Sequence, residues 1–221
     1  MPSSSRGCRP LGVFTGKLYS SAHGDLRLSS RLPGILRRHD VPKTTKPAIM
    51  AHSVRRLFTV TDAQIRGLAE LLIDCVEGGA SVSFMHPLPM AKALDFWRQV
   101  AAGVAQGERA LLVAEDAQGT VGTVQLVFGQ PENQPHRADL SKMLVHRRAR
   151  RRGLGAALLR EAERVARDCR KTLLVLDTAS GDAERLYARL GWQRCGVIPG
   201  YALLPRGGFC DTTYFYRALE G

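Results

Sequence analysis

The chain has 221 residues, 44% of them apolar, and a formal net charge of +12. This length and composition allow one substantial hydrophobic core. The charge is uneven: residues 1–49 carry nine lysines and arginines against two acidic residues, which leaves +5 for residues 50–221. Residues 50–221 also lack the basic stripe with interleaved aromatic residues that is typical of nucleic-acid binders. We therefore expect no nucleic-acid partner for this part of the chain.

Cysteine spacing and hydropathy exclude further classes of protein. The five cysteines are odd in number and form no Cys-x-x-Cys pair, which argues against a disulfide framework and a zinc site, so no metal is expected. We interpret Cys75, Cys169 and Cys195 as small core residues in a reducing compartment. No apolar run approaches the ~20 residues that span a bilayer, so we expect a soluble, cytoplasmic protein without a membrane partner.

The chain divides near residue 50. Residues 1–49 are rich in Ser, Arg, Gly and Pro and lack sustained periodicity, which predicts a disordered segment or an extension upstream of a natural start at Met50. A targeting peptide is the alternative, because the segment is basic, serine-rich and poor in acidic residues. Residues 50–221 are predicted to form one folded domain.

Within this domain, segments whose apolar residues have the spacing typical of strands alternate with segments that have the spacing typical of helices. A strand over 54–59 precedes a helix that begins with a capping box at Thr61–Gln64 and stops at Gly78–Gly79. The further predicted elements are a helix at 89–105, strands at 109–115, 120–128 and 137–145, a helix at 153–168, a strand at 172–178, a helix at 182–190, and strands at 191–197 and 212–216. The strand at 172–178 is almost entirely apolar, which predicts burial of both its faces.

The most informative segment joins the strand that ends at Val145 to the helix that begins at Gly153. Five arginines fill the turn between them, and Gly153 and Gly155 let the backbone approach a ligand closely. A helix N-terminus presents unpaired N–H groups and a positive dipole end, so the turn predicts a diphosphate site. The P-loop pattern is absent, and Leu158 stands where a dinucleotide fingerprint needs its third glycine.

The pattern Arg150-x-x-Gly153-x-Gly155 resembles the pyrophosphate-binding signature of the GNAT superfamily of N-acetyltransferases, and the order of predicted elements resembles the GNAT core. The resemblance implies an α/β (α+β) fold with a mixed, mostly antiparallel central sheet flanked by about four helices, here the N-acetyltransferase domain of residues 50–221. It also implies acetyl-CoA as the acetyl donor. The residues that would bind it are Met143, Leu144, Val145, Arg150, Arg151, Arg152, Gly153, Leu154, Gly155, Ala156, Ser180 and Tyr187.

A second GNAT signature matches residues 180–192. Alanine, tyrosine and glycine stand at the matching positions 183, 187 and 191, while Ser180 replaces the usual asparagine. By this resemblance Tyr187 lies near the cofactor sulfur and returns a proton to the leaving thiolate. A core tyrosine on an amphipathic helix is the alternative.

A closer resemblance, to the tabtoxin-resistance branch of the superfamily, rests on residues 71–85, 139–145, 176–178 and 199–201. Enzymes of this branch acetylate the free amine of a β-lactam amino-acid toxin. The resemblance implies that Asp139 and Asp177 bind the amine and remove its proton, and Phe84 and Met85 are expected to wall the amine pocket. Either acid could instead be structural, and which of the two is the base stays open.

Acetyl transfer to an aliphatic amine needs a base, because an amine with a pKa near ~10.4 is almost entirely protonated at neutral pH. We therefore predict an acetyl-CoA-dependent N-acetyltransferase that acts on a small-molecule primary amine by direct attack, with a role in resistance to a toxin or antibiotic. The alternatives are an aminoglycoside or polyamine acetyltransferase and a non-catalytic CoA-binding sensor. The sequence does not decide whether the chain forms a homodimer.

Overall fold

The computed structural model of the chain describes residues 53–220. Seven strands form one sheet in the order β1-β2-β3-β4-β5-β7-β6, and all neighbours are antiparallel except β4 and β5. The strands are β1 (Val54–Leu57), β2 (Arg109–Asp116), β3 (Gly119–Val127), β4 (Arg137–Val145), β5 (Leu173–Thr178), β6 (Gln193–Leu203) and β7 (Phe209–Ala218). The helices are α1 (Asp62–Glu77), α2 (Met90–Ala105), α3 (Leu154–Asp168) and α4 (Gly181–Arg189), with a 3₁₀ turn at Arg147–Ala149. The predicted mixed, mostly antiparallel sheet with four helices is confirmed.

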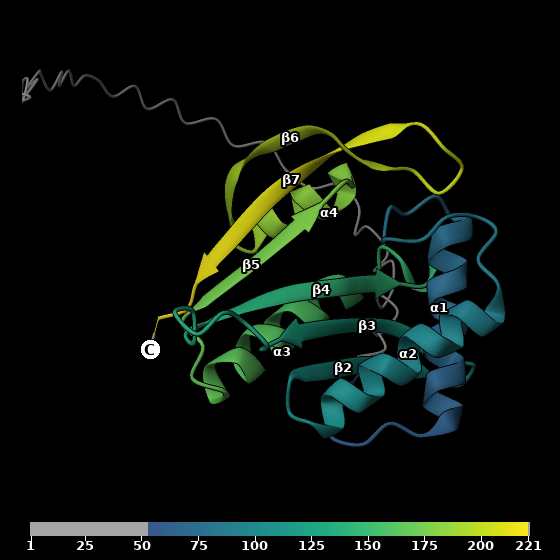
Figure 1. The fold of residues 1–221 in the computed structure, drawn as a ribbon, viewed down its shortest axis with the longest axis horizontal. Helices are drawn as coiled ribbons and strands as arrows, with labels where there is room; N and C mark the ends of the chain where they lie inside the picture. The colour runs from purple at the N-terminus through teal and green to yellow at the C-terminus, as the bar shows by residue number, and fades with distance from the viewer. Residues whose placement is uncertain (1–52, 221) are drawn as a thin grey trace, which may run out of the picture. The chain divides into compact units, whose positions relative to one another are not determined.

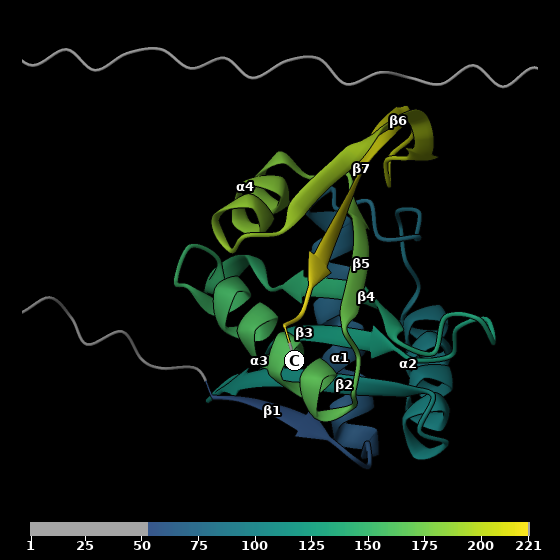
Figure 2. The ribbon, with the colours of Figure 1, turned by 90° about the vertical axis from the view of Figure 1, so that its left-hand side faces the viewer.

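Helices cover both faces of the sheet. The pair α1 and α2 packs on one face over β2 to β4, and α3 and α4 pack on the other (Figure 2). The predicted capping box starts α1: the Thr61 hydroxyl accepts a hydrogen bond from the Gln64 N–H, and the Gln64 side chain accepts one from the Thr61 N–H. The apolar stripe of α1 and the fully buried Trp97 of α2 then form one core cluster.

The second core cluster lies under α3 and α4. Apolar residues of α3 pack on the inner strands, and Tyr187 of α4 packs against Trp192 and Phe215 at ring-centroid distances of 5.8 and 5.6 Å. The buried indole N–H of Trp192 donates a 3.0 Å hydrogen bond to Glu163 of α3. This bond joins the turn between α4 and β6 to α3 and satisfies a polar group that burial would otherwise leave unpaired.

The two parallel strands pair over only part of their length. Residues 137–139 of β4 pair with residues 173–175 of β5, and beyond this point the two strands diverge (Figure 1). The sheet therefore opens into a V whose arms are β1 to β4 on one side and β5, β7 and β6 on the other. The gap lies at the carboxyl ends of the parallel strands, where open α/β sheets bind ligands.

A β-bulge in β4 lies beside this gap. Gln125 of β3 pairs with Ser141, but Thr123 pairs with Leu144, so β4 carries one extra residue between these pairs. Lys142 has a φ of +49° there. The extra residue reverses the alternation of side chains: Leu140 packs in the α3 cluster, whereas Leu144 packs in the α1 and α2 cluster.

Three predictions need correction, and a fourth concerns residues that the structure does not describe. In β5 Leu174 and Leu176 are buried but Asp177 is exposed, so the predicted burial of both faces was wrong. Among residues 53–220, α3 and α4 cover one face of this strand. Both β6 and β7 are longer than predicted, because their pairing continues on both sides of Pro199-Gly200, with an irregularity in the register between Ile198 and Ala202. Cys195 is exposed on β6 and is not a core residue, because β6 is an edge strand. The prediction for residues 1–49 lies outside the described residues.

Candidate active site

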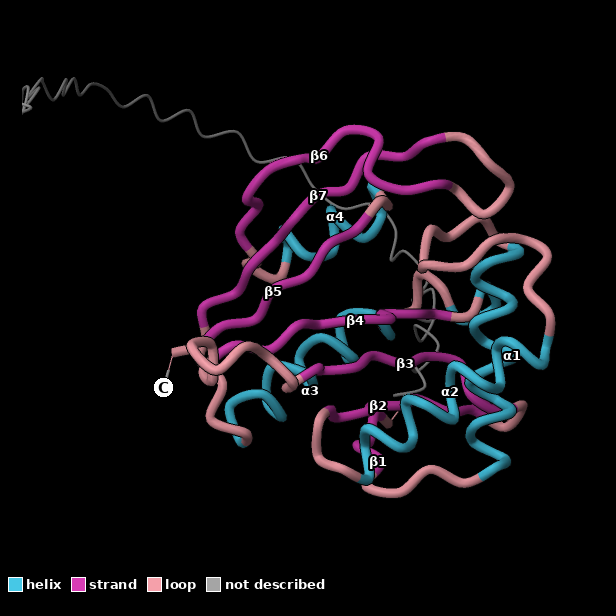
Figure 3. The backbone as a smooth tube through the Cα atoms, in the orientation of Figure 1, coloured by secondary structure: helices cyan, strands magenta, loops and turns pink. Residues whose placement is uncertain are grey.

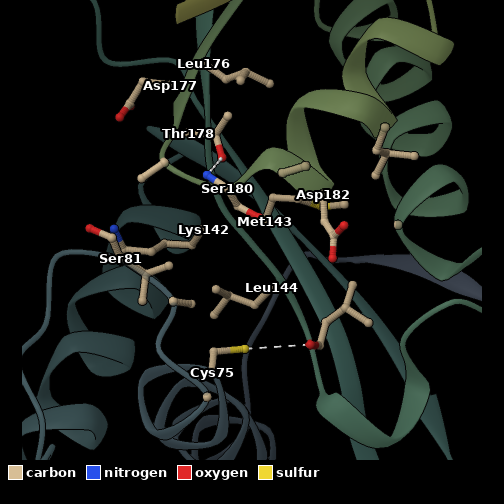
Figure 4. A pocket seen from close by; sticks show the side chains of 18 of the residues that line it. Cys75, Ser81, Lys142, Met143, Leu144, Leu176, Asp177, Thr178, Ser180 and Asp182 are labelled. Atoms are coloured by element: carbon tan, nitrogen blue, oxygen red, sulfur yellow. Dashed lines mark hydrogen bonds between the residues drawn. The ribbon is translucent and has the colours of Figure 1, made fainter. Parts of the chain in front are cut away.

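A pocket of about 1130 Å³ occupies the gap between β4 and β5 (Figure 4). We call the part lined by residues of segments 143–156 and 178–189 the cofactor half. The part lined by residues 79–85, 141–142, 177, 201–204 and 212 is the acceptor half. Of the residues predicted for the site, the pocket brings together all except Arg152 and Asp139, which do not line it.

The start of α3 forms the floor of the cofactor half. Gly153 takes a left-handed conformation, with φ of +81°, directly before the helix, and a residue with a Cβ would be strained there. Ala157 is the first residue of α3 whose N–H reaches an acceptor of the same helix, the carbonyl of Gly153. The three preceding N–H groups have no acceptor within the helix, and they point out of its positive end. This arrangement suits a diphosphate.

Gly155 serves a different purpose from Gly153. A Cβ at Gly155 would lie 2.9 Å from Leu186 of α4 and 3.2 Å from Met143 of β4. The missing side chain therefore lets α3, α4 and β4 approach one another beside the cofactor half. Sequence analysis treated both glycines as sites of close ligand approach, whereas the contacts of Gly155 are with the protein.

Four of the five arginines of the turn divide into two groups; the fifth, Arg152, neither lines the pocket nor forms a salt bridge within residues 53–220. Arg147 and Arg148 hold the turn in place: Arg147 is bound to α1, and Arg148 pairs with Asp116 of the β2–β3 hairpin at 3.0 Å. Arg150 and Arg151 line the pocket. Within residues 53–220, neither forms a salt bridge. Only part of the positive charge that the sequence places here is therefore free to meet an anion.

Asp74 of α1 anchors this turn, and sequence analysis did not identify it. Its carboxylate accepts hydrogen bonds from the backbone N–H of Arg147 at 2.9 Å and from the Arg147 guanidinium at 2.7 Å, and His146 Nδ1 lies 3.4 Å away. Burial alone would raise the pKa of Asp74, but the hydrogen bonds from Arg147 and the nearby charges outweigh it and hold the pKa below 3.8. An acidic residue among the apolar residues of an amphipathic helix was the available signal.

The end of β4 presents backbone groups to the gap. His146 donates its N–H to the carbonyl of Val121 at 2.9 Å, while Val145 stands opposite Gly122. Hydrogen-bonded and non-hydrogen-bonded pairs alternate in antiparallel strands, so the N–H and C=O of Val145 point away from β3 and into the gap. Consistent with this direction, the carbonyl of Val145 accepts from Arg150 Nε at 3.2 Å and from the Cys75 thiol at 3.8 Å.

Among the cysteines of residues 53–220, Cys75 is the one that lines the pocket. Its side chain lines the pocket and is 2% exposed, and burial raises its pKa to about 11. About one thiol in ten thousand is ionised at neutral pH with such a pKa, and the thiolate is the nucleophilic form. A thioester on this cysteine is therefore disfavoured, in keeping with the predicted direct attack.

Asp177 lies at the end of β5, in the acceptor half. Its carboxylate accepts a 3.0 Å hydrogen bond from the hydroxyl of Thr212, and the residue is exposed. Within residues 53–220, it has no cation within salt-bridge distance. A carboxylate with one hydrogen bond and no ion pair retains lone pairs for an incoming amine.

Asp139 lies earlier on β4, where β4 and β5 are still paired. Its two carboxylate oxygens are occupied: Arg137 donates to one at 2.5 Å, and Gln130 donates to the other at 3.1 Å. Asp139 shares a sheet face with Asp177, because it pairs with Val175 of β5, and Val175 and Asp177 are two residues apart on that strand. The two predicted acids therefore share a face but differ in their partners.

The loop after α1 and the β6–β7 hairpin close the acceptor half (Figure 3). The Ser81 hydroxyl donates to the carbonyl of Leu203 at 3.2 Å, and the His86 N–H donates to the carbonyl of Pro205 at 2.8 Å. Phe84 packs edge-to-face on Phe96 of α2 with ring centroids 5.2 Å apart, and Met85 is 45% exposed. Both predicted wall residues line the pocket.

Tyr187 and Ser180 of the second signature line the cofactor half. Tyr187 is 3% exposed, and burial raises its pKa above the ordinary value of 10, so its hydroxyl remains protonated at neutral pH. The Ser180 side chain does not cap α4, although Ser180 precedes the helix. Its hydroxyl is therefore available to a ligand.

Comparison with known proteins gives a family match for part of the domain and several structures with a similar fold. Residues 107–194 match the family model described as an acetyltransferase (GNAT) domain. The fold resembles ribosomal-protein-alanine N-acetyltransferase from Brucella melitensis, with 23% sequence identity and a TM-score of 0.62 over 76% of this chain and 99% of that one. It also resembles phosphinothricin acetyltransferase from Sinorhizobium meliloti in complex with acetyl-CoA, with 20% identity and a TM-score of 0.65 over 77% and 89%.

A third similar structure is that of yncA from Salmonella typhimurium with its cofactor acetyl-CoA, at 20% identity and a TM-score of 0.64 over 77% of this chain and 95% of that one. At these identities the likeness shows the shared fold, while the family match covers the arginine-rich turn before α3 and the second signature. No helix among residues 53–220 has the length and apolar character needed to cross a membrane. Residues 107–194 thus match an acetyltransferase (GNAT) domain, and the described part of the chain has the fold of these acetyltransferase structures.

Proposed function

We propose that the protein transfers the acetyl group of acetyl-CoA to a primary amine of a small molecule, by direct attack of the amine. The observation that carries the proposal is the continuous pocket across the β4–β5 gap, with the start of α3 at one end and Asp177 at the other. Bound acetyl-CoA would supply the acetyl group as an activated thioester. Donor and acceptor would then meet between the two strands.

The cofactor half supplies groups for three parts of such a donor. The free N–H groups at the start of α3, with Arg150 and Arg151, would hold its diphosphate. The Ser180 hydroxyl would contact its pantetheine arm. The inward N–H of Val145 would polarise the thioester carbonyl, since a fixed backbone donor needs no reorganisation during reaction.

Two side chains would move protons. Asp177 accepts a proton from the acceptor ammonium, which yields the neutral amine that attacks. Tyr187, held protonated by burial, would give its proton to the thiolate that leaves as the C–S bond breaks, and the nitrogen would lose its second proton to solvent as the amide forms. We favour Asp177 over Asp139 as the base, because both oxygens of Asp139 already accept hydrogen bonds and its side chain does not line the pocket.

The same reaction would inactivate a toxin or antibiotic whose action depends on a free amine. The resemblance of residues 71–85 to the tabtoxin-resistance branch supports this role, as does the similarity in fold to phosphinothricin acetyltransferase. Under this proposal the acceptor is a small amine that Phe84 and Met85 enclose.

Thiol release from acetyl-CoA, measured against a panel of amines, tests the proposal. The panel spans amino acids, β-lactam amino acids, polyamines and aminoglycosides, and each amine is tried with wild type, Asp177→Asn and Asp139→Asn. Loss of the base should lower kcat/KM about 10²- to 10⁴-fold in Asp177→Asn. The loss should shrink as the pH rises, because the free amine then becomes available without a base. Asp139→Asn is the matched comparison, and we expect a loss below about tenfold.

Three outcomes would contradict parts of this scheme. Equal losses in the two variants would remove the distinction between the acids, and full activity of Asp177→Asn would exclude Asp177 as the base. Binding of acetyl-CoA without acetylation of any amine would favour a non-catalytic CoA-binding sensor.

A further inference from the structure

Lys142 is a charged residue of the acceptor half with no role in the reaction described above. It is the residue with positive φ in the bulge of β4, and its side chain lines the pocket on the same side as Asp177 (Figure 4). Lys142 and Asp177 are the two ionisable groups with opposite charge that line this half of the pocket.

The contacts of the Lys142 ammonium are with neutral groups. Its Nζ donates to the Ser83 hydroxyl at 3.1 Å and lies 5.7 Å from the centroid of the Phe96 ring. Among residues 53–220, no carboxylate lies within 4.0 Å of it. Burial lowers the pKa of Lys142, whereas the charge of Asp177 acts in the opposite direction. Asp177 is thus close enough to influence Lys142 without pairing with it.

A partly buried cation normally has an anionic partner, because burial without one costs hydration energy. Here each of the two opposite charges has one hydroxyl as a hydrogen-bond partner, Ser83 for Lys142 and Thr212 for Asp177. A ligand that carries both an ammonium and a carboxylate would satisfy both groups together. A polycation would instead bring positive charge against Lys142, which Coulomb repulsion disfavours.

We propose that Lys142 binds a carboxylate of the acceptor, and that the acceptor is a zwitterion: an amino acid or a small molecule that carries both the amine to be acetylated and a carboxylate. This inference rests on the proposed function, because it assumes that the amine lies at Asp177. Lys142 then determines specificity, and the bulge of β4 positions it.

Matched pairs of acceptors test the inference. Each amino acid is compared with its own carboxamide, which keeps the amine and the side chain but removes the negative charge. The quantity measured is the ratio of kcat/KM for the acid to kcat/KM for the amide, in wild type, Lys142→Met and Lys142→Arg. Lys92→Met is the control for the substitution itself, because Lys92 also lies over an aromatic ring, 5.9 Å from the Phe84 centroid, but does not line the pocket.

Wild type should prefer acids to amides. The ratio should fall about 10- to 100-fold in Lys142→Met, the range expected for loss of one hydrogen-bonded charge pair. Lys142→Arg should retain most of the preference, because its charge remains, and Lys92→Met should match wild type. The affinity for acetyl-CoA and the thermal midpoint, measured for every variant, separate a change in specificity from a change in fold.

Two results would overturn the inference while the proposed function stands. One is equal use of acids and amides by wild type, and the other is an equal loss for both in Lys142→Met. If wild type acetylates no amine of either kind, the proposed function itself fails, and the carboxylate site fails with it.

Discussion

Replacement of Asp74 by asparagine should destabilise the protein and loosen the cofactor half. The Asp74 side chain is 10% exposed and accepts two hydrogen bonds from Arg147, one from the backbone and one from the guanidinium. Asparagine has nearly the same shape but no charge, and one of its terminal atoms is a donor that cannot accept from Arg147. A hydrogen bond to a charged group contributes roughly 1.5–3 kcal/mol, so we expect a loss of about that size in the free energy of unfolding.

An exposed ion pair provides the matched control. Asp95 pairs with Arg98 at 2.7 Å on α2, but both side chains are at least 60% exposed. Such pairs contribute less than about 1 kcal/mol, so Asp95→Asn should change stability little. Urea-induced unfolding of both variants and wild type gives the comparison. Titration with acetyl-CoA then shows whether the loosened turn weakens binding in Asp74→Asn alone.

The dependence on pH supplies a second check. The pKa of Asp74 is lower in the folded protein than the ordinary value of 3.8. The ionised carboxylate therefore stabilises the fold above that value, and this contribution is lost as the pH falls through the lower folded-state pKa. The difference in stability between wild type and Asp74→Asn should be present at neutral pH and should decrease below pH 4. A loss no larger than that of Asp95→Asn, or a difference that persists unchanged at pH 3, would refute the anchoring role.

Two further predictions concern the pocket. Gly153→Ala should destabilise the protein by about 1–2 kcal/mol and weaken acetyl-CoA binding, because an alanine at φ of +81° is strained even though no atom lies within 4 Å of the added Cβ. Urea-induced unfolding measures the loss of stability, and calorimetric titration measures the binding of acetyl-CoA. An unchanged stability would show that the backbone is not strained by a Cβ at this position. Cys75 should carry no acetyl group during turnover, because its pKa is about 11. Mass spectrometry of the enzyme, after a reaction with acetyl-CoA and acceptor has been quenched, checks this. Direct attack would be contradicted if Cys75 carried an acetyl group and the Cys75→Ala variant lost turnover.

Local patterns were sufficient to predict most of the fold. The capping box at Thr61, the apolar periods of the helices and the turn before Gly153 depend on residues close together in the chain, and each lies where it was predicted. Most of the cofactor-binding residues predicted around the glycine signature line the pocket, but Arg152 does not, and their binding of acetyl-CoA stays a prediction. The edge strand β6 was predicted too short because its pairing with β7, which spans the Pro-Gly irregularity, is a tertiary property.

The residues that sequence analysis missed depend on contacts between distant segments. Asp74 and Arg147 are 73 positions apart, and a carboxylate on α1 reveals nothing about its partner until the two elements are packed together. The partners of Asp139 differ, because both are close to it in the chain: Arg137 lies two positions away on β4 and Gln130 nine positions away in the preceding loop. The conformation of that loop, which no local pattern predicts, brings Gln130 to a carboxylate oxygen.

The bulge of β4 shows how one extra residue changes which side chains of a strand lie on each face of the sheet. Strict alternation would place Leu140 and Leu144 on one face, with Met143 and Val145 on the other. The extra residue instead sends Leu144 to the α1 and α2 cluster and packs Met143 and Val145 against the α3 cluster. It also leaves Lys142 in the acceptor half. A period-of-two pattern cannot reveal a bulge at a non-glycine residue, because the left-handed conformation of Lys142 has no signature in its side chain. The residue that we propose to select the substrate is therefore the one whose position depends most on the irregularity of its strand.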